Sequence, residues 1–388
     1  MANTLTNLYP ALYASLDVVS RELVGMIPAV TMDARVDRAA INQSVYVPIT
    51  AANTAGANIT PAMSVPAAAD QTVGNSEIKI TKSRAFPFSW EGNEQDLLDN
   101  NGAGYMGIRN NQITQAMRAC VAEVEADLTA LQAGFSRAYG TAASTPFGTA
   151  GDFTDASNVL KILKDNGAPL SDNHLVVNTT AGANFLGKQG TYNTQGDNSI
   201  LRQGVFQTVS GMAIRESGYI VTQTAGAMAN ATTTSAALTV GQTVIPLATA
   251  GTGVVAAGDI ITIANDTNKY VVTSVSFAGA NPASGDTITI AAPGLRKAQS
   301  SAAYAITVVA TSARNMAFNR SAIVLATRMP ERPKEGDMAL DVMSITDPRS
   351  GLTFEISMYP GYRKVRYEVA LAWGTKLIKP EHTALLLG

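Results

Sequence analysis

Residues 110–139 read NNQITQAMRACVAEVEADLTALQAGFSRAY, and this stretch decides the fold. Its apolar residues recur at steps of three and four, which places them along one stripe of a helix. The stripe consists of Ile113, Met117, Cys120, Val121, Val124, Leu128, Leu131 and Phe135. At 1.5 Å per residue, a helix of this length would run about 45 Å. The pattern therefore predicts one long helix that spans a domain and forms the backbone of the fold.

The residues before this helix predict an amphipathic helix and then a long hairpin. Residues 11–27 carry apolar side chains at helical spacing, and Pro28 ends the pattern. A strand signal at 45–47 leads into a loop over 50–72 that is rich in Ala, Asn, Thr and Pro, and alternation at 77–82 brings the chain back to the aromatic run 86–90. Because a lone two-stranded hairpin is marginal in water, we expect this arm to lie on a neighbouring subunit.

The residues after the long helix predict an α+β region that a small β domain interrupts. A linker at 140–151 precedes a helix at 156–163, a buried strand at 174–177 and further short strands within 206–221. Between about 224 and 312, few residues are charged, and short β-rich runs are separated by Gly, Asn and Ser turns. This stretch predicts a sandwich or barrel inserted into the larger domain.

After residue 312 the sequence again resembles the part before the insertion, and the end of the chain predicts strands. Residues 315–318 are followed by a helix or strand through Ile323 and Leu325. Alternating apolar residues at 352–358 and 365–371 flank the turn Tyr-Pro-Gly-Tyr at 359–362, which predicts a hairpin. Residues 377–381 close the domain.

The composition argues against enzymes and against proteins that grip nucleic acid. Only 15% of the 388 residues are charged, against about 25% in an average soluble protein, and the net charge is −2. With only two His and one Cys, the chain lacks the residues that most metal sites and nucleophilic triads require. The polar start lacks the features of a signal peptide, no apolar run is long enough to span a membrane, and one Cys forms no internal disulfide, so folding in a reducing cytoplasm is expected.

The motifs that resemble catalytic or binding sites are weak. Residues 182–188 fit the G-x-x-x-x-G-K pattern of a phosphate loop, but Gln189 stands where a hydroxyl should bind magnesium, so a surface helix or turn is favoured. Residues 251–256 match a dinucleotide pattern only loosely, with no helix after them. Glu123 and Asp127 lie one turn apart without a His, which favours a solvated acidic face over a metal site.

The remaining candidates also favour structural roles. His174 and His382 lie far apart in the sequence and have no nucleophile elbow with them. Cys120 lies on the apolar stripe and is expected to be a small buried side chain. The basic residues Arg363, Lys364 and Arg366, near two tyrosines, are expected at a subunit contact rather than in a nucleic-acid groove.

The order of these parts resembles the major capsid protein of tailed bacteriophages, the Hong Kong 97-type fold. The segment AGDIITI at 257–263 is similar to the strand that begins insertion domains in the podovirus-type branch of these coat proteins. NMAFNRSAI at 315–323 resembles the segment that re-enters the core domain, and VRYEVALAWG at 365–374 followed by KPE at 379–381 resembles the closing strand. The resemblance covers nearly the whole chain.

The resemblance implies an α+β fold with a spine helix, an extended loop and an inserted all-β domain. Its parts would be an N-terminal arm and helix (1–44), the extended loop (45–92), the spine helix with peripheral domain (93–150), two axial segments (151–225 and 312–335), the insertion (226–311), and peripheral strands returning to the axial domain (336–388). The extended loop would reach over a neighbouring subunit. Candidate contacts between subunits are Pro61, Met63, Val65, Pro66, Phe86, Trp90, Arg363 and Arg366.

The expected function is self-assembly into an icosahedral shell that encloses double-stranded DNA, with no catalysis and no cofactor. Weak, repeated and largely uncharged contacts would hold many copies together as hexamers and pentamers. Since only about forty residues precede the extended loop, a separate scaffolding protein is expected, together with a portal. The chain would be made in the bacterial host cytoplasm and would end in the virion, without contact to membrane. A phage tail-tube protein or a carbohydrate-binding structural protein is the alternative, and an ATP-dependent enzyme rests on residues 182–188 alone.

Overall fold

The computed structural model describes residues 24–50, 61, 73–100, 105–149, 152–189, 208–346 and 351–388. Its longest helix is α3 (Tyr105–Ala130), about 39 Å long at 1.5 Å per residue. The predicted stripe is confirmed between residues 113 and 128, where all its apolar members are buried. The predicted end is wrong, because a 3-10 turn, η3 (Leu131–Gly134), follows and Phe135 is extended. Residues Arg137–Tyr139 form strand β5, whose pairing on both sides outweighs the helical pattern.

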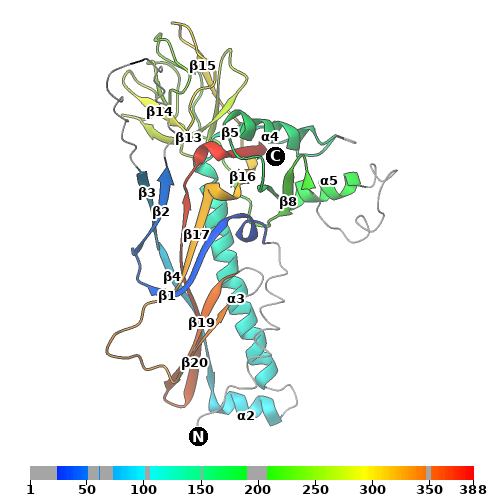
Figure 1. Ribbon diagram of the computed structural model, residues 1–388, viewed down its shortest axis with the longest axis vertical. Coiled ribbons are helices and arrows are strands. Elements are labelled where there is room, and N and C mark those ends of the chain that lie inside the picture. Colours follow the sequence, from blue (N-terminus) through cyan, green and yellow to red (C-terminus); the bar gives the residue numbers. More distant parts are fainter. Residues whose placement is uncertain are drawn as a thin grey trace.

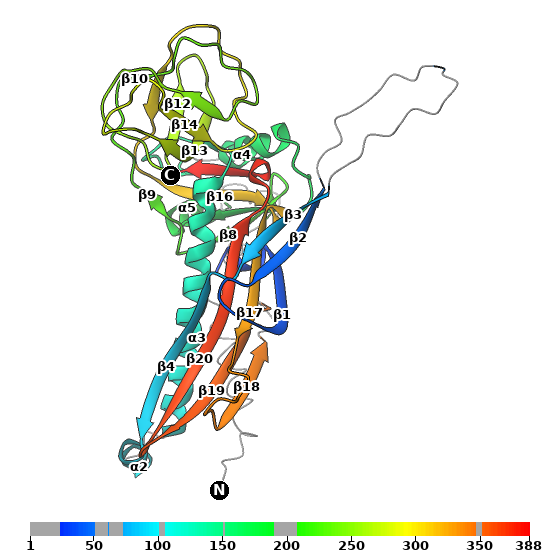
Figure 2. The same ribbon diagram turned by 90° about the vertical axis from the view of Figure 1, so that its left-hand side faces the viewer.

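A six-stranded sheet lies along α3 and gives the molecule its length (Figures 1 and 2). Its strands are β1 (Thr31–Ala39), β4 (Lys82–Glu91), β17 (Ile323–Pro330), β18 (Asp341–Thr346), β19 (Thr353–Gly361) and β20 (Lys364–Leu377). The hairpin predicted from the C-terminal alternation is confirmed as β19 and β20, which pair from Glu355–Ala370 to Gly361–Lys364. The side chain of Trp373 on β20 is fully buried in the main core, against α3.

The predicted arm is a separate antiparallel hairpin of β2 (Ser44–Thr50) and β3 (Val73–Lys79). Figure 2 shows it leading away from the side of the sheet. The aromatic run 86–90 does not continue the hairpin: it belongs to β4, which pairs with β20 from Lys82–Trp373 to Glu91–Lys364. The break at residues 80–81 therefore separates the hairpin from a strand of the sheet. The tip of the hairpin, apart from Pro61, lies outside the described residues.

The α+β region is built as predicted around a second sheet. The central strands are β6 (Asn173–Val177), β8 (Met212–Glu216), β16 (Ser312–Asn319) and β21 (Thr383–Leu387), with β7 (Thr208–Val209) at the edge. Helix α4 (Thr154–Asp165) packs on it through a face that includes Val159 and Leu163, and α5 (Thr179–Gln189) contributes Phe185 to the same core. The region between Ile323 and Leu325, which the sequence leaves open between helix and strand, is strand β17. The short turns η5 (Arg320–Ala322) and η6 (Pro380–His382) precede β17 and β21.

The β insertion is confirmed by the pairing at its two ends. Strand β9 (Thr222–Gln223) pairs with β16 as Gln223–Ser312 and Thr222–Ala313, so the chain leaves and returns side by side. Between these points lie β10 (Ala231–Thr232), β11 (Val244–Pro246), β12 (Ile260–Ile263), β13 (Lys269–Ser276), β14 (Thr287–Ile290) and β15 (Ala305–Val308), around a core of their own. Strand β13 also pairs with β5, which makes one continuous sheet through both domains.

The predicted N-terminal helix is wrong at its end. Residues 24–26 are not helical, and Pro28 lies inside a 3-10 turn, η2 (Ile27–Ala29), before the chain enters β1. The earlier part of the predicted helix, up to residue 23, lies outside the described residues. No helix in the described part of the chain is long and apolar enough to cross a membrane.

Candidate subunit interfaces

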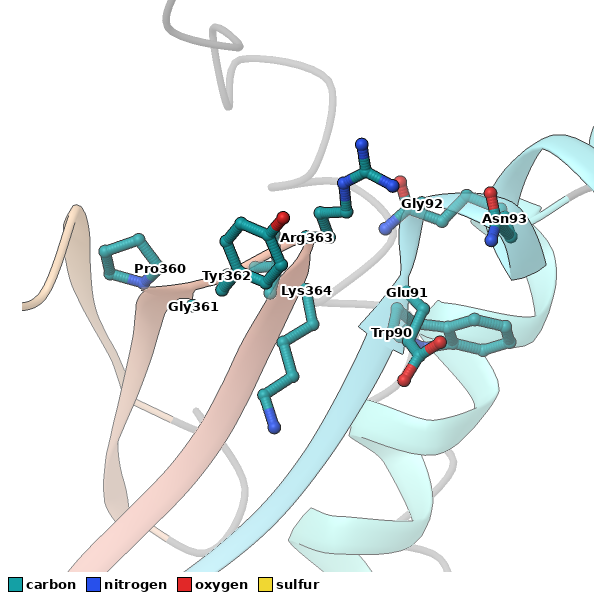
Figure 3. A pocket seen from close by; sticks show the side chains of 11 residues that line it. Trp90, Glu91, Gly92, Asn93, Pro360, Gly361, Tyr362, Arg363 and Lys364 are labelled. Carbon is teal, nitrogen blue, oxygen red and sulfur yellow. The ribbon is translucent and has the colours of Figure 1, made fainter.

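One end of the long sheet forms a hollow of about 700 Å³ between two chain segments (Figure 3). One wall is the end of β4 and the start of α2 (Gly92–Asn100), and the other is the turn between β19 and β20. The backbone N–H of Gly92 donates to the carbonyl of Arg363 over 3.2 Å, and Glu91 stands opposite Lys364 in register. These bonds fix the two walls relative to each other. The hollow and the insertion lie at opposite ends of the molecule (Figure 1).

The turn itself presents two exposed side chains, Tyr362 and Arg363. Tyr362 is 90% exposed, the highest value among the large apolar residues described, and Arg363 lies 5.8 Å from the centre of its ring. Arg363 has a φ of 56°, in the left-handed region that Gly and Asn adopt more readily. An arginine there costs about 1 kcal/mol relative to glycine. The left-handed conformation of the turn therefore does not account for an arginine at position 363.

A buried aromatic cluster supports the hollow from below. Trp90 is 8% exposed, donates its indole N–H to Gln112 over 2.7 Å, and packs edge-on against Tyr105. The hydroxyl groups of Tyr105 and Tyr367 are 3.2 Å apart, and the Arg109 guanidinium lies over both rings. Burial raises the pKa of Tyr105. Trp90 thus packs inside its own subunit and leaves little surface for a neighbour.

The other predicted contact residues have varied surroundings. Arg366 is exposed and pairs with Glu368 over 3.0 Å, whereas Phe86 is half-buried against the main core. Pro61 is exposed. Met63, Val65 and Pro66 lie outside the described residues.

The β2–β3 hairpin is attached to the body at its base only, among the described residues. Ile78 and Ile80 are buried against β17 and β20, and the Lys376 ammonium donates to the Glu77 carbonyl over 2.7 Å. Ser44 and Glu77 are joined by a side-chain hydrogen bond across the hairpin. Tyr46, which stands opposite Glu77 in register, is 64% exposed. The hairpin therefore has a fixed base that presents an exposed aromatic side chain.

The base of the insertion is held by Asp259, in the segment that carries the resemblance. Its Oδ2 accepts the backbone N–H of Gly226 at 3.1 Å and of Ala256 at 2.7 Å, and Gly258 before it has a φ of 89°. The nearby Arg314 guanidinium is fully buried; burial lowers its pKa to about 10, and Asp259 opposes that shift. Asp259 thus joins the turn at residues 256–259 to Gly226, where the insertion begins.

No protein-family model matches the chain, and no curated protein matches it. Three solved structures illustrate what it is similar to. A chain of Mycobacterium phage Che8 is 13% identical, with 89% of this chain and 84% of that chain covered and a TM-score of 0.43. The capsid of Cyanophage P-SCSP1u is 10% identical, with 92% and 86% covered and a TM-score of 0.48. The mature capsid of bacteriophage PhiM1 is 10% identical, with 93% and 85% covered and a TM-score of 0.44.

The parts of the chain themselves follow the order that the resemblance implies. A hairpin arm, a long helix along a long sheet, an α+β domain, a β insertion with paired ends and closing strands succeed one another. The structure thus has the succession of parts that the resemblance to the Hong Kong 97-type fold implies. In this arrangement α3 corresponds to the spine helix, and the hollow lies at the far end of the six-stranded sheet (Figure 1).

The phosphate-loop pattern does not form a loop in the structure. Residues Thr179–Gln189 are helix α5, and the backbone N–H of Gly182 donates to the Asn178 carbonyl inside it. A Cβ on Gly182 would lie 2.9 Å from the Glu216 carboxyl carbon, so this glycine permits close packing on β8. The helix after a strand that the sequence favours is confirmed. The side chain of Lys188 is not described.

The acidic residues of the spine helix hold it to the sheet, which the sequence did not predict. Asp127 binds the Lys82 ammonium at 2.7 Å and accepts the indole N–H of Trp373 at 2.8 Å, while Glu123 pairs with Arg84 at 3.0 Å. The expectation of a merely solvated acidic face is wrong, because these carboxylates meet basic residues of β4. The i, i+4 spacing of Glu123 and Asp127 does not by itself reveal these ion pairs with β4.

Glu125 is the largest omission from the sequence-based prediction. It is fully buried, and its carboxylate accepts the backbone N–H groups of Gly25, Met26 and Ile27 at 2.7–3.1 Å and the Ser217 hydroxyl at 2.8 Å. Burial raises its pKa, against the effect of these four donors. The spine helix therefore fixes the N-terminal arm through one carboxylate. The one sequence feature that indicates this buried carboxylate is an acidic residue at the edge of the apolar stripe.

The other single residues behave as the sequence indicates. Cys120 is fully buried on the stripe, and burial raises the pKa of its thiol. The His174 ring bonds to Asp172 at 3.1 Å and lies in a buried strand. No group of three or more acidic, His or Cys side chains that could hold a metal ion occurs among the described residues.

Proposed function

We propose that this chain is the major capsid protein of a tailed bacteriophage, which assembles with a separate scaffolding protein into an icosahedral shell around double-stranded DNA. The observation that carries the proposal is the exposure of large side chains at two distant points of one elongated subunit. Tyr46 on the projecting hairpin is 64% exposed, and Tyr362 at the end of the sheet is 90% exposed. Exposed aromatic groups at separate sites suit a subunit that meets several copies of itself.

The rigid connections inside the subunit support the same proposal. A shell subunit must hold its contact surfaces in fixed relative positions, because small errors in angle prevent closure. The spine helix is tied to the sheet by Asp127 and Glu123, and the insertion shares a continuous sheet with the core through β13 and β5. The contact surfaces are thereby held on one framework. We propose that hexamers and pentamers form from this subunit, with a portal at one vertex.

The charge of the chain suits a container for DNA. A strongly basic inner wall would bind packaged DNA through counterion release and hinder its movement. The net charge of −2 avoids this. We therefore place the protein in the virion, after assembly in the host cytoplasm, without sequence-specific contact to DNA.

The carbohydrate-binding alternative finds no support in the insertion. Binding sites for small ligands rely on exposed aromatic and polar groups that converge in a pocket. The insertion has three aromatic residues; Tyr270 and Tyr304 are buried and Phe277 is half-buried in its core. No exposed aromatic platform remains on residues 226–311, all of which are described.

Expression of the full chain with and without its scaffolding protein tests the proposal. We expect closed shells in the presence of the scaffolding protein, seen by electron microscopy and as a fast-sedimenting species. A variant in which residues 52–71 are replaced by a short turn is expected to fold, since the base of the hairpin is kept, but not to close shells. A product that stays monomeric under all these conditions would overturn the proposal, and stacked rings forming tubes would favour the tail-tube alternative.

A further inference from the structure

The turn at the end of the peripheral sheet has properties that its own subunit does not use. Tyr362 is 90% exposed, and Arg363 occupies a left-handed position where a glycine would be less strained. Among the described residues, no carboxylate pairs with the Arg363 guanidinium, which lies 5.8 Å from the centre of the Tyr362 ring. Tyrosine and arginine are the residue types most often found at the centre of protein interfaces.

The helix that begins at the opposite wall of the hollow carries acidic residues. Helix α2 contains Glu94, Asp96 and Asp99 and no basic residue. Glu94 caps the helix by accepting the backbone N–H of Glu91, and Asp99 accepts that of Tyr105, whereas Asp96 is exposed and makes no hydrogen bond or ion pair within the described residues. The exposed Arg363 and the exposed Asp96 thus lie on the two segments whose ends wall the hollow of about 700 Å³, and Asp96 itself stands outside that lining.

Within the described part of the subunit, no ion pair joins Arg363 to Asp96. Glu91 and Lys364 stand opposite each other in register on β4 and β20. Figure 3 shows the Arg363 side chain directed away from those of Glu91 and Lys364. A surface that offers one charge on each side can join to a second copy of itself in a head-to-tail manner, and such contacts close into a ring where the rotation between copies closes.

We propose that the Tyr362–Arg363 turn of one subunit docks against the acidic α2 of the next subunit around a symmetry axis, with Arg363 facing Asp96 of that neighbour. This inference rests on the proposed shell assembly and specifies one of its contacts. The Tyr362 ring supplies the apolar area of this contact. The charge pair sets which sides meet, because reversed charges in contact are strongly unfavourable.

Charge-swap variants of the full chain test this contact in the assembly experiment with the scaffolding protein. We expect Arg363→Glu and Asp96→Arg each to lower the yield of closed shells by at least about tenfold, since each places like charges together. The double variant restores opposite charges at every contact, and its yield should return to within about twofold of wild type. Tyr362→Ala should lower the yield without any change of charge.

Lys161→Glu is the matched control, because it makes the same change of charge as Arg363→Glu on a side chain of α4 that is 71% exposed. We expect wild-type yield from it, and circular dichroism checks that all variants fold. Wild-type yields from both single swaps, or a double variant no better than the singles, would overturn the contact while shell assembly itself stands. Failure of the wild-type chain to assemble would instead overturn the proposed function.

Discussion

Asp127 offers a quantitative test of how the spine helix is fixed to the sheet. Its Oδ2 accepts the indole N–H of Trp373, which is fully buried, and its Oδ1 binds the Lys82 ammonium, which is 42% exposed. A buried donor left without an acceptor costs about 1–3 kcal/mol, whereas a half-exposed ion pair contributes about 0.2–1 kcal/mol. The hydrogen bond to the indole should therefore outweigh the ion pair.

Three variants separate the two interactions. Asp127→Ala removes both and should lower the free energy of unfolding by about 2–3 kcal/mol. Asp127→Asn keeps an acceptor for the indole and should cost about 0.5–1 kcal/mol, and Lys82→Met, which keeps the side-chain stem over the Trp373 ring, should cost a similar amount.

Urea unfolding of the unassembled subunit measures these differences through tryptophan fluorescence. The chain has two tryptophans, so a Trp90→Phe background leaves Trp373 as the one reporter. Midpoints should shift while the slope of the transition stays constant. Equal costs for the Ala and Asn variants would refute the reasoning, because they would mean that the indole hydrogen bond contributes nothing beyond the ion pair.

Three further predictions follow from buried polar groups. Glu125→Ala leaves the N–H groups of residues 25–27 without their acceptor and should cost about 3 kcal/mol, with faster hydrogen exchange at those amides and unchanged exchange in the insertion. Asp259→Ala should cost about 2 kcal/mol and increase protease cleavage near Gly226, and wild-type resistance there would contradict the role given to Asp259. Burial lowers the pKa of His174 in the folded chain, so its stabilising contribution is present above about pH 6.5 and is lost as the pH falls through the lower folded-state pKa. The variant His174→Gln should therefore lose less stability than wild type between pH 7 and pH 5 in urea unfolding. An unchanged dependence of stability on pH would argue against this role of His174.

The sequence predicts the elements whose side chains alternate or recur on one face. The spine helix, the β19–β20 hairpin and the strands of the insertion follow from periodicity, because the buried face of each is continuous. The helix prediction fails after residue 130, where Phe135 keeps the helical spacing but pairing of β5 with β13 and β21 fixes an extended backbone. The pattern within one segment does not show which strands will pair with it, and here that pairing decides between helix and strand.

Sequence spacing says less about contact residues than about the fold. The aromatic residues in the extended segment 86–90 predict exposure, but β4 pairs with β20, so Trp90 is buried and Phe86 is half-buried. The charge of Arg363 is visible in the sequence, whereas its left-handed turn and the hollow are not. A carboxylate near an apolar stripe usually faces solvent, and only the fold brings three N–H groups to Glu125.

The distribution of charge also changes how the proposed assembly would work. The low overall charge predicts contacts that are largely uncharged, and the insertion fits that description. At the opposite end of the molecule, however, the β19–β20 turn carries the exposed Arg363 and α2 carries the exposed Asp96, neither of them in an ion pair among the described residues. Apolar contacts alone would let copies associate in many registers, because they are not directional. A few charges placed at one end restrict the permitted register at little cost in total affinity, which is what a shell that must close at defined angles requires.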